Sequence, residues 1–405
     1  MNLGSLWVLL ASVAMLCLGH GLSGSLISLA ADQNHFGTDV TGFVMAGYSA
    51  GLLLSTVLTP RLVRSVGHVR TFAGLASSVS TAVLLFPLWV DPVFWFVLRV
   101  ITGLCVSGMF IVCESWLNTA STNRNRGRMM SFYMIVTYGA LGLGQLLLNV
   151  PDDSGFVRFI LVSCLLSISL VPLILLPSEA PSVEHAQTAS LRGIWRASPL
   201  ALVGVFACGL AQSAFFALGV VFGLSKGLPL VLVSIMMALP PLGVIFSQYP
   251  IGWISDRFDR RTIIMLLSFV SVAIAAVTLI GGFYISRLML ISLMTAFGIV
   301  SLPIYSLVVA HANDHLRKEQ VLGASAKLIL VYGVGSIIGP LLVGALMRRI
   351  GGDGFLIYMI VVQSALGGFA LWRRWRTADH LRAQGSDVMT VSPVATQARP
   401  SLAGD

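Results

Sequence analysis

A few side chains that can hold or exchange charge stand inside long apolar runs of this sequence. His20, Arg99 and Glu114 each interrupt such a run, and Lys327 stands close to the start of another. Hydrophobic residues make up 56% of the chain and charged residues only 10%, so these positions are unusual. Because an ionisable group inside an apolar segment is costly to bury, we expect these residues to exchange protons or to bind a charged substrate.

Arg99 and Glu114 fall in the same apolar run, and each has more than one interpretation. Arg99, in the stretch LRVITG, could attract an anion or change the proton affinity of a neighbour, or it could extend to the outer membrane surface. Glu114 could gain and lose a proton as part of its function, or it could pair with a cation of residues 61–70. On one helix the two residues would lie about 22 Å apart, so we expect no pairing between them.

His20 and Gln212 occupy equivalent positions when the sequence is shifted by 192 residues. An imidazole titrates near neutral pH, so His20 could relay protons or bond a substrate, or it could make a neutral hydrogen bond between helices. Two polar side chains at the same depth predict a central cavity. Lys327 is either a site residue or a cation whose ammonium group extends to the inner membrane surface.

The elements that must hold these residues are apolar segments long enough to cross a membrane. A helix of about 20 apolar residues spans about 30 Å of hydrocarbon. The mean hydropathy of +0.90 is typical of a chain made largely of such segments. The sequence therefore predicts an all-α polytopic membrane protein with 12 transmembrane helices. The predicted spans are 6–30, 41–60, 71–90, 94–116, 129–149, 157–176, 199–223, 230–251, 262–283, 287–310, 325–347 and 354–372.

The two sets of six spans are related to each other by an internal repeat. A shift of 192 residues aligns 60–70 with 252–262, and a shift of 194 aligns Tyr138-Gly139 with Tyr332-Gly333. Such repeats are typical of transporters built from two pseudo-symmetric six-helix bundles. The predicted organisation is an N-terminal bundle (1–176), a cytoplasmic linker (177–198), a C-terminal bundle (199–372) and a basic, disordered cytoplasmic tail (373–405).

Charge and cysteine usage narrow the function. Most of the 25 lysines and arginines fall on the side of the two termini, so we expect both termini in the cytoplasm and attribute the net charge of +9 to topology rather than to nucleic-acid binding. The five cysteines lie in apolar runs without metal-ligand spacing. The sequence has no nucleophile motif, no paired carboxylates within the spans and no phosphate-binding loop, which predicts a protein that is not an enzyme and uses no cofactor, metal or nucleotide.

The stretch GWISDRFDRR, residues 252–261, lies between two apolar runs and predicts a short cytoplasmic hairpin. It resembles the loop signature of the major facilitator superfamily, which has the form G-x-L/I-x-D-R-x-G-R-R. Asp259 stands in place of the second glycine of that signature. The first half retains less of it, because Arg64 stands in place of the aspartate. The matching positions of the second half are Gly252, Ile254, Asp256, Arg257, Arg260 and Arg261, and those of the first half are Gly67 and Arg70.

The resemblance implies that these loops form cytoplasmic gates, although their charges could instead serve only to anchor the topology. Asp314, at the end of the tenth predicted span, is a candidate partner for Arg257 or Arg260. Oppositely charged groups could hold neighbouring helices together in one state and release them in another. The predicted gate consists of Gly252, Asp256, Arg257, Arg260, Arg261, Arg64, Gly67, Arg70 and Asp314.

The stretches ESWLN (114–118) and HAND (311–314) end the fourth and tenth predicted spans and resemble a poorly characterised bacterial 12-span subfamily of these permeases. The resemblance implies a monomeric secondary transporter of the bacterial inner membrane that moves a small molecule by alternating access. Its site would lie between helices one, four, seven and ten. We expect the proton gradient to supply the energy and export to be favoured over uptake. A membrane receptor that keeps the permease fold without transporting is the alternative.

Overall fold

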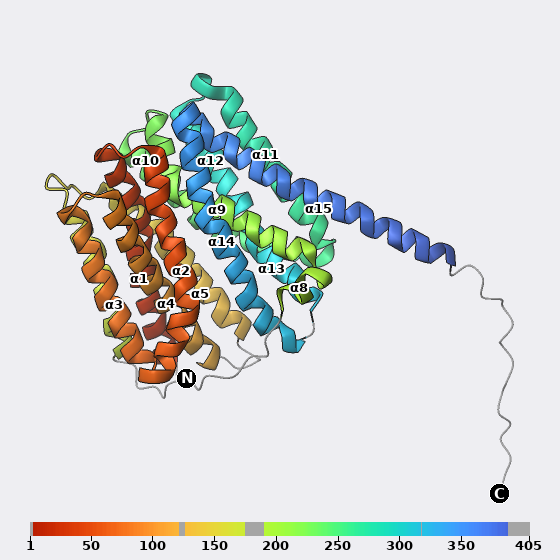
Figure 1. The fold of residues 1–405 in the computed structure, drawn as a ribbon, viewed down its shortest axis with the longest axis horizontal. Helices are drawn as coiled ribbons and strands as arrows, with labels where there is room; N and C mark the ends of the chain where they lie inside the picture. Colours follow the sequence, from red (N-terminus) through yellow and green to blue (C-terminus); the bar gives the residue numbers. More distant parts are fainter. Residues whose placement is uncertain (1–2, 121–125, 175–189, 317, 388–405) are drawn as a thin grey trace, which may run out of the picture.

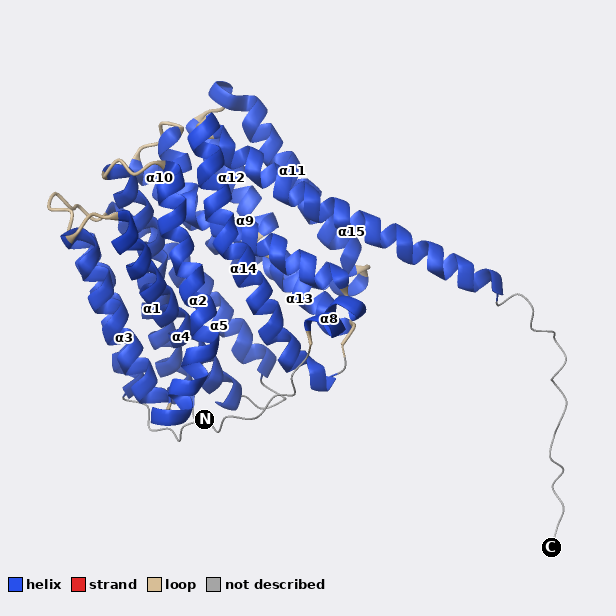
Figure 2. Cartoon of the chain, viewed as in Figure 1, coloured by secondary structure: helices blue, strands red, loops and turns tan. Residues whose placement is uncertain are grey.

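The computed structural model of the chain describes residues 3–120, 126–174, 190–316 and 318–387. In these ranges the chain forms helices joined by turns and loops, and no strand (Figure 2). Twelve helical segments of this part are long and apolar enough to cross a membrane, which confirms the predicted all-α polytopic fold. Helices form here because, in hydrocarbon, every backbone N–H and C=O must be bonded within its own segment.

The first half of the molecule contains six spans, and its sixth span is divided into two shorter helices. Short 3-10 turns, η1 (Phe86–Leu88) and η2 (Leu147–Asn149), follow the third and fifth of these spans. The helices are α1 (Leu3–Gln33), α2 (Thr38–Val66), α3 (His68–Leu85), α4 (Pro92–Ala120), α5 (Arg126–Leu146), α6 (Val157–Ile168) and α7 (Leu170–Ile174).

The second half begins after a short helix, α8 (Leu191–Ala197), which lies in the predicted linker; residues 177–189 of that linker are outside the described residues. The last helix continues to Asp387, so the segment predicted to be disordered from Arg373 is helical up to that residue. The helices are α9 (Pro199–Ser225), α10 (Leu230–Arg257), α11 (Arg260–Gly281), α12 (Arg287–Ser301), α13 (Ile304–Asp314), α14 (Lys318–Ile350) and α15 (Asp353–Asp387), with the turn η3 (Gly282–Tyr284) after α11.

Figure 1 shows the two halves side by side, the first on the left and the second on the right. We call the side that carries the start of α1 and the α2–α3 and α10–α11 junctions the terminal side, and the opposite side the distal side. The helices of the second half slant away from the first half toward the terminal side (Figure 1). The halves therefore converge at the distal side.

Among the described residues, four polar side-chain contacts join the two halves near the distal ends of their helices. Ser28 on α1 donates a hydrogen bond to the carbonyl of Ala217 on α9 at 2.8 Å. The remaining three contacts involve α2 with α14 and the turn η2, which follows α5, with α10. They are the hydrogen bond from Thr38 to the Gly344 carbonyl (2.9 Å), the ion pair of Asp39 with Arg348 (2.5 Å) and the hydrogen bond from Asn149 to Ser234 (2.7 Å).

The tenth span is broken, whereas the sequence predicts one continuous helix over 287–310. The break follows from Pro303, which has no N–H to donate and leaves the carbonyl of Ile299 without its usual helical partner. The Ser247 hydroxyl on α10 donates to that carbonyl at 3.3 Å. The carbonyl of Leu302 at the break accepts from the Gln212 amide at 3.1 Å, so a predicted site residue helps to stabilise the irregular backbone.

Candidate functional site

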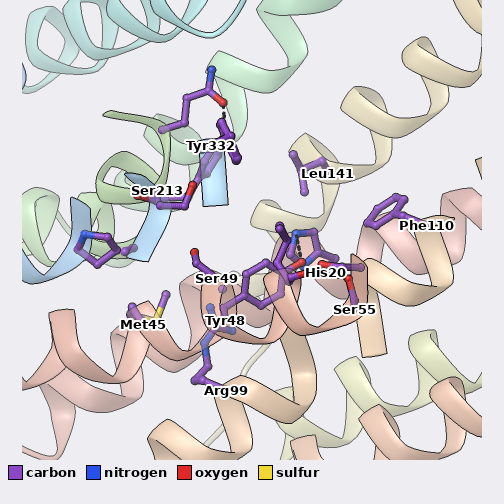
Figure 3. Close-up of a pocket in the computed structure, with 18 of the residues that line it drawn as sticks. His20, Met45, Tyr48, Ser49, Ser55, Arg99, Phe110, Leu141, Ser213 and Tyr332 are labelled. Atoms are coloured by element: carbon purple, nitrogen blue, oxygen red, sulfur yellow. Dashed lines mark hydrogen bonds between the residues drawn. The ribbon is translucent and has the colours of Figure 1, made fainter. Parts of the chain in front are cut away.

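A cavity of about 450 Å³ lies between the two halves, and Figure 3 shows residues that line it. Six helices contribute side chains: α1, α2, α4 and α5 from the first half, and α9 and α14 from the second. The prediction that the tenth span lines the site is wrong for this cavity. The broken tenth span contributes the carbonyl that supports Gln212 rather than a lining residue, because α2, α5 and α14 occupy the remaining wall.

His20 and Tyr48 form a stacked pair in the first-half wall of the cavity. Their ring centroids lie 5.2 Å apart, and the Tyr48 hydroxyl is 3.5 Å from Nε2 of His20. Figure 3 shows His20 and Tyr48 close together, with Arg99 on the other side of Tyr48. The His20 ring also contacts Phe110 edge to face. His20 therefore lies at the cavity, as the sequence predicts, but its neighbour is an aromatic hydroxyl that the sequence analysis did not single out.

Arg99 is buried beside the cavity with 5% of its surface exposed. Its guanidinium carbon lies 4.9 Å from the centre of the Tyr48 ring, and its Nε has no hydrogen-bond partner. Within the described part of the chain it forms no ion pair. A desolvated cation–π contact is worth about 2 kcal/mol, whereas burying an unpaired charge costs several kcal/mol. The protein therefore keeps this cation in place at a net energetic cost.

Gly103 explains how Tyr48 reaches Arg99. A Cβ atom at position 103 would lie 2.0 Å from the backbone carbonyl oxygen of Tyr48, which is far inside van der Waals contact. Only glycine therefore allows α4 to approach α2 this closely. The same approach places Tyr48 over the arginine one turn earlier on α4. The spacing of Arg99 and Gly103 thus positions the cation as well as packing the two helices.

Glu114 lines the same cavity further toward the terminal side. Tyr133 on α5 donates a hydrogen bond to its Oε1 at 3.1 Å. The alternative prediction, an ion pair with a cation of residues 61–70, does not form among the described residues, because Arg64 and Arg70 are exposed outside the cavity. Glu114 is therefore a carboxylate that faces a space large enough for water and solute.

The second-half wall of the cavity carries uncharged polar groups. Tyr332 on α14 donates a hydrogen bond to the Gln212 carbonyl oxygen at 3.1 Å, and its ring contacts Tyr305 edge to face. Ser213 and Ser336 also line this wall. Lys327 is half-buried on α14 but is not among the lining residues, so this candidate lies outside the cavity. The lining residues of the second half therefore offer hydrogen bonds without a charge.

The α10–α11 junction holds most of the predicted gate residues. The helices continue further than expected, so the predicted hairpin is reduced to Phe258 and Asp259. Arg260 bridges two carboxylates, with Nη2 at 2.7 Å from Asp256 and Nε at 2.7 Å from Asp314 on α13. The latter is one of the two pairings predicted for Asp314. Asp259 accepts from the N–H of Arg261, so the residue that replaces the signature glycine caps α11.

Of the other two cations of this junction, Arg257 lies over an aromatic ring and Arg261 makes a hydrogen bond with a histidine. The Arg257 guanidinium lies 3.7 Å from the centre of the Trp253 ring, and Nη2 of Arg261 lies 3.4 Å from Nε2 of His315. Gly252 lies within α10, and a Cβ added there would meet no atom within 4 Å. The geometry therefore gives roles to the charged residues of the signature but no steric reason for its first glycine.

The α2–α3 junction of the first half has no such ion network among the described residues. Gly67 forms the turn with φ at +86°, a conformation that favours glycine. Arg64 donates to the Pro60 carbonyl of its own helix, and Arg70 is exposed. His68 at this junction is buried, and its Nε2 lies 3.1 Å from the Ser115 hydroxyl.

Several cavity residues were missed by sequence reasoning. Tyr48, Tyr332 and Gln145 all line the cavity, and Ser25 donates a hydrogen bond to Gln145 within it. Tyr332 had a detectable signal, since it matches Tyr138 in the internal repeat. For the others the signal was a polar side chain in mid-span, which is easily mistaken for a local packing contact. In the described part of the chain, no group of three His, Cys, Asp or Glu residues could hold a metal ion.

Comparison with known proteins identifies the family of the chain. The model of the Major Facilitator Superfamily matches residues 9–248 and 202–398. The uncharacterized MFS-type transporter YcaD of Escherichia coli O17:K52:H18 is 26% identical over 360 residues, which cover 87% of this chain and 91% of YcaD. YcaD of Escherichia coli O45:K1 has the same identity and coverage.

Two solved structures share the fold. One is a bacterial homolog of the human lysosomal transporter Spinster, in an inward-facing and unoccupied conformation, with a TM-score of 0.71, 11% identity and coverage of 92% of this chain and 95% of that chain. The other is the nucleoside transporter NupG, with a TM-score of 0.71, 15% identity and coverage of 92% and 98%. At these identities the similarity concerns the fold.

Proposed function

The chain belongs to the major facilitator superfamily, a family of secondary transporters, and we propose that it couples the movement of a small molecule to the movement of protons. The observation that carries the proposal is the cavity between the halves, whose first-half wall contains His20, Arg99 and Glu114. A proton-coupled transporter needs a group that gains and loses a proton close to the substrate. Glu114 meets this need, because it is a carboxylate that faces the cavity and has a neutral hydroxyl as its partner.

Alternating access is supported by the position of the contacts between the halves. The contacts of Ser28 with Ala217 and of Thr38 with Gly344 lie on the distal side of the cavity. They consist of single hydroxyl-to-carbonyl bonds, which can break without leaving a buried charge unpaired. In the proposed cycle they open while the terminal side closes, and the Asp256–Arg260–Asp314 network keeps α10, α11 and α13 together as one moving unit.

The proposed setting is the bacterial inner membrane with the terminal side in the cytoplasm. The cations of both helix junctions lie on that side, and cytoplasmic loops are enriched in lysine and arginine. We take the monomer as the working unit, because one chain forms the whole cavity. We also favour export over import, because the mostly apolar wall suits amphipathic compounds, which enter cells through the bilayer unaided.

The test is transport by the purified protein in proteoliposomes loaded with a metabolite extract from bacterial cells. The external medium is made acidic, and compounds that leave the vesicles are identified by mass spectrometry. We expect at least one compound to leave faster with the pH gradient than without it, and a protonophore to remove the difference. The Glu114→Gln variant should show no gradient-dependent release. Arg287→Gln, an exposed residue at the start of α12, is the matched control and should behave as the wild type.

Two results would contradict the proposal. Release that depends on the gradient equally in wild type and Glu114→Gln would show that another group carries the proton. Compounds that bind the protein but are never released by it would indicate a receptor that has kept the permease fold.

A further inference from the structure

Among the described residues that line the cavity, Arg99 is the single arginine or lysine. It is almost completely buried, its Nε is unpartnered, and no carboxylate of the described residues pairs with it. A buried charge without a counter-ion is strongly unfavourable unless a partner is supplied. A solute anion that enters the cavity can supply that partner.

The neighbours of Arg99 leave part of its guanidinium available. The guanidinium carbon lies 4.9 Å from the centre of the Tyr48 ring, and within the described part of the chain the guanidinium donates no hydrogen bond. Its N–H donors form a planar fork that matches two oxygens of a carboxylate or sulfonate. Glu114 does not compete for them, because it lies about 22 Å further along α4. The available geometry is that of an oxyanion site.

The rest of the cavity indicates what the anion must be attached to. Its wall is largely apolar and is supplied by both halves of the molecule. Among the described residues, the second-half wall adds hydrogen-bonding groups but no cation. An ionised Glu114 would repel a solute that carried a second negative group at its terminal-side end. The large apolar side chains that line the cavity include Met45, Leu52, Phe110, Leu141 and Phe216.

We propose that the cavity binds an organic monoanion, with its carboxylate or sulfonate on Arg99 and its apolar body between the two halves. This inference rests on the proposed function and narrows its substrate class. The proposed anion site requires a negative charge on the substrate. The other role considered for Arg99, adjusting the proton affinity of His20, requires no such charge.

The first experiment compares matched probes on the wild-type protein by thermal shift. The probes are 2-naphthoate and 1-pyrenebutyrate, each paired with its uncharged carboxamide of nearly the same shape. We expect the carboxylates to raise the melting temperature in a saturable way, and the carboxamides to bind at least about tenfold more weakly because they lack the charge-assisted bond. Equal stabilisation by carboxylate and carboxamide, or by neither, would overturn the proposal.

The second experiment places the charge effect at Arg99. Arg99→Gln should lose the difference between carboxylate and carboxamide, and Arg99→Lys should keep part of it, since a lysine retains the charge but not the planar fork. Arg287→Gln serves as control and should respond as the wild type. Full carboxylate binding by Arg99→Gln would overturn the assignment. If that variant does not fold, the wild-type comparison of the two probes decides alone.

The two proposals fail in different ways. Carboxylate binding without any proton-driven release from proteoliposomes would leave the anion site intact and contradict transport. Proton-driven release confined to uncharged or cationic compounds would leave transport intact and contradict the anion site.

Discussion

At the cavity, the first half contributes His20, Arg99 and Glu114, whereas the second half contributes uncharged groups such as Gln212 and Tyr332. At the terminal-side junctions the distribution is reversed. The second half joins three helices through a network of two carboxylates and an arginine, while the first half uses the neutral contact of an imidazole with a hydroxyl. The two bundles therefore differ in where their charged groups lie: beside the cavity in the first half, and at the terminal-side junction in the second half.

This difference suggests a division of roles between the halves. A charge beside the cavity can act on a proton or a substrate, so the chemistry of the proposed cycle belongs to the first half. A charge network at a junction acts on the relative position of helices, so the second half supplies the rigid unit. His68 illustrates the divergence, because the shift of 192 residues places it on Arg260. Equivalent positions in the repeat now hold a neutral and an ionic contact.

The largest effect is expected for Glu114→Gln, which removes the proton-exchanging group from the first-half wall. Glutamine keeps the size of the side chain and an acceptor for Tyr133, so the fold should be retained. Transport driven by a pH gradient should fall to the level of empty liposomes. Exchange of the same compound across the membrane without a gradient should persist, since it requires no net proton movement. Loss of both activities together would indicate a structural role instead.

A smaller effect is expected when the two walls are made alike. His20→Gln gives the first half the side chain that the second half has at the equivalent position. If the His20 imidazole makes a hydrogen bond to the substrate, losing that bond costs about 1 kcal/mol and should weaken substrate binding roughly fivefold. Measuring KM and maximal rate at several pH values separates the alternatives. A change in KM alone indicates a hydrogen bond to substrate, and a changed pH profile indicates proton relay.

A still smaller effect is expected at the junctions. Arg260→Gln breaks two partly exposed ion pairs, each worth about 0.2–1 kcal/mol, and should lower the melting temperature by about 2 °C. Because the Debye length shrinks from about 10 Å at 0.1 M salt to about 3 Å at 1 M, this loss should diminish at high salt. His68→Gln is the matched variant in the first half, and its effect should not depend on salt. Equal salt dependence of both variants would refute the distinction between the junctions.

Much of the fold could be predicted from the sequence because membrane helices are determined locally. Apolar length gave the twelve spans, and the repeat placed His20 and Gln212 at the same depth. The pairing of Asp314 with Arg260 was among the predicted pairings, since both residues stand at the ends of spans on the same side. These inferences need only distances along the chain and opposite charges.

The remaining features depend on how helices pack, which spacing alone does not specify. Tyr48 reaches Arg99 only because α2 and α4 touch at Gly103. The tenth span is interrupted at Pro303, and two backbone carbonyls there accept hydrogen bonds from side chains of other helices. The donors are Ser247 on α10 and Gln212 on α9. The distal contacts were missed for the same reason, because they connect segments from opposite halves.

The smallest expected effect tests whether the halves are held together on the distal side by charge or by backbone contacts. Asp39 and Arg348 join α2 to α14, but the arginine side chain is 63% exposed, so the pair should contribute at most about 1 kcal/mol. Arg348→Gln should therefore reduce the distally closed population by no more than about fivefold, as measured from distances between spin labels on α2 and α14. The exchanged pair, Asp39→Arg with Arg348→Asp, should restore the distally closed population.

Lys226→Gln is the control, because its partner Asp353 lies in the same half. An unchanged distance distribution in Arg348→Gln would show that the Asp39–Arg348 ion pair does not hold the distal side closed. The closure would then be assigned to the hydrogen bonds of the Thr38 and Ser28 hydroxyls with backbone carbonyls.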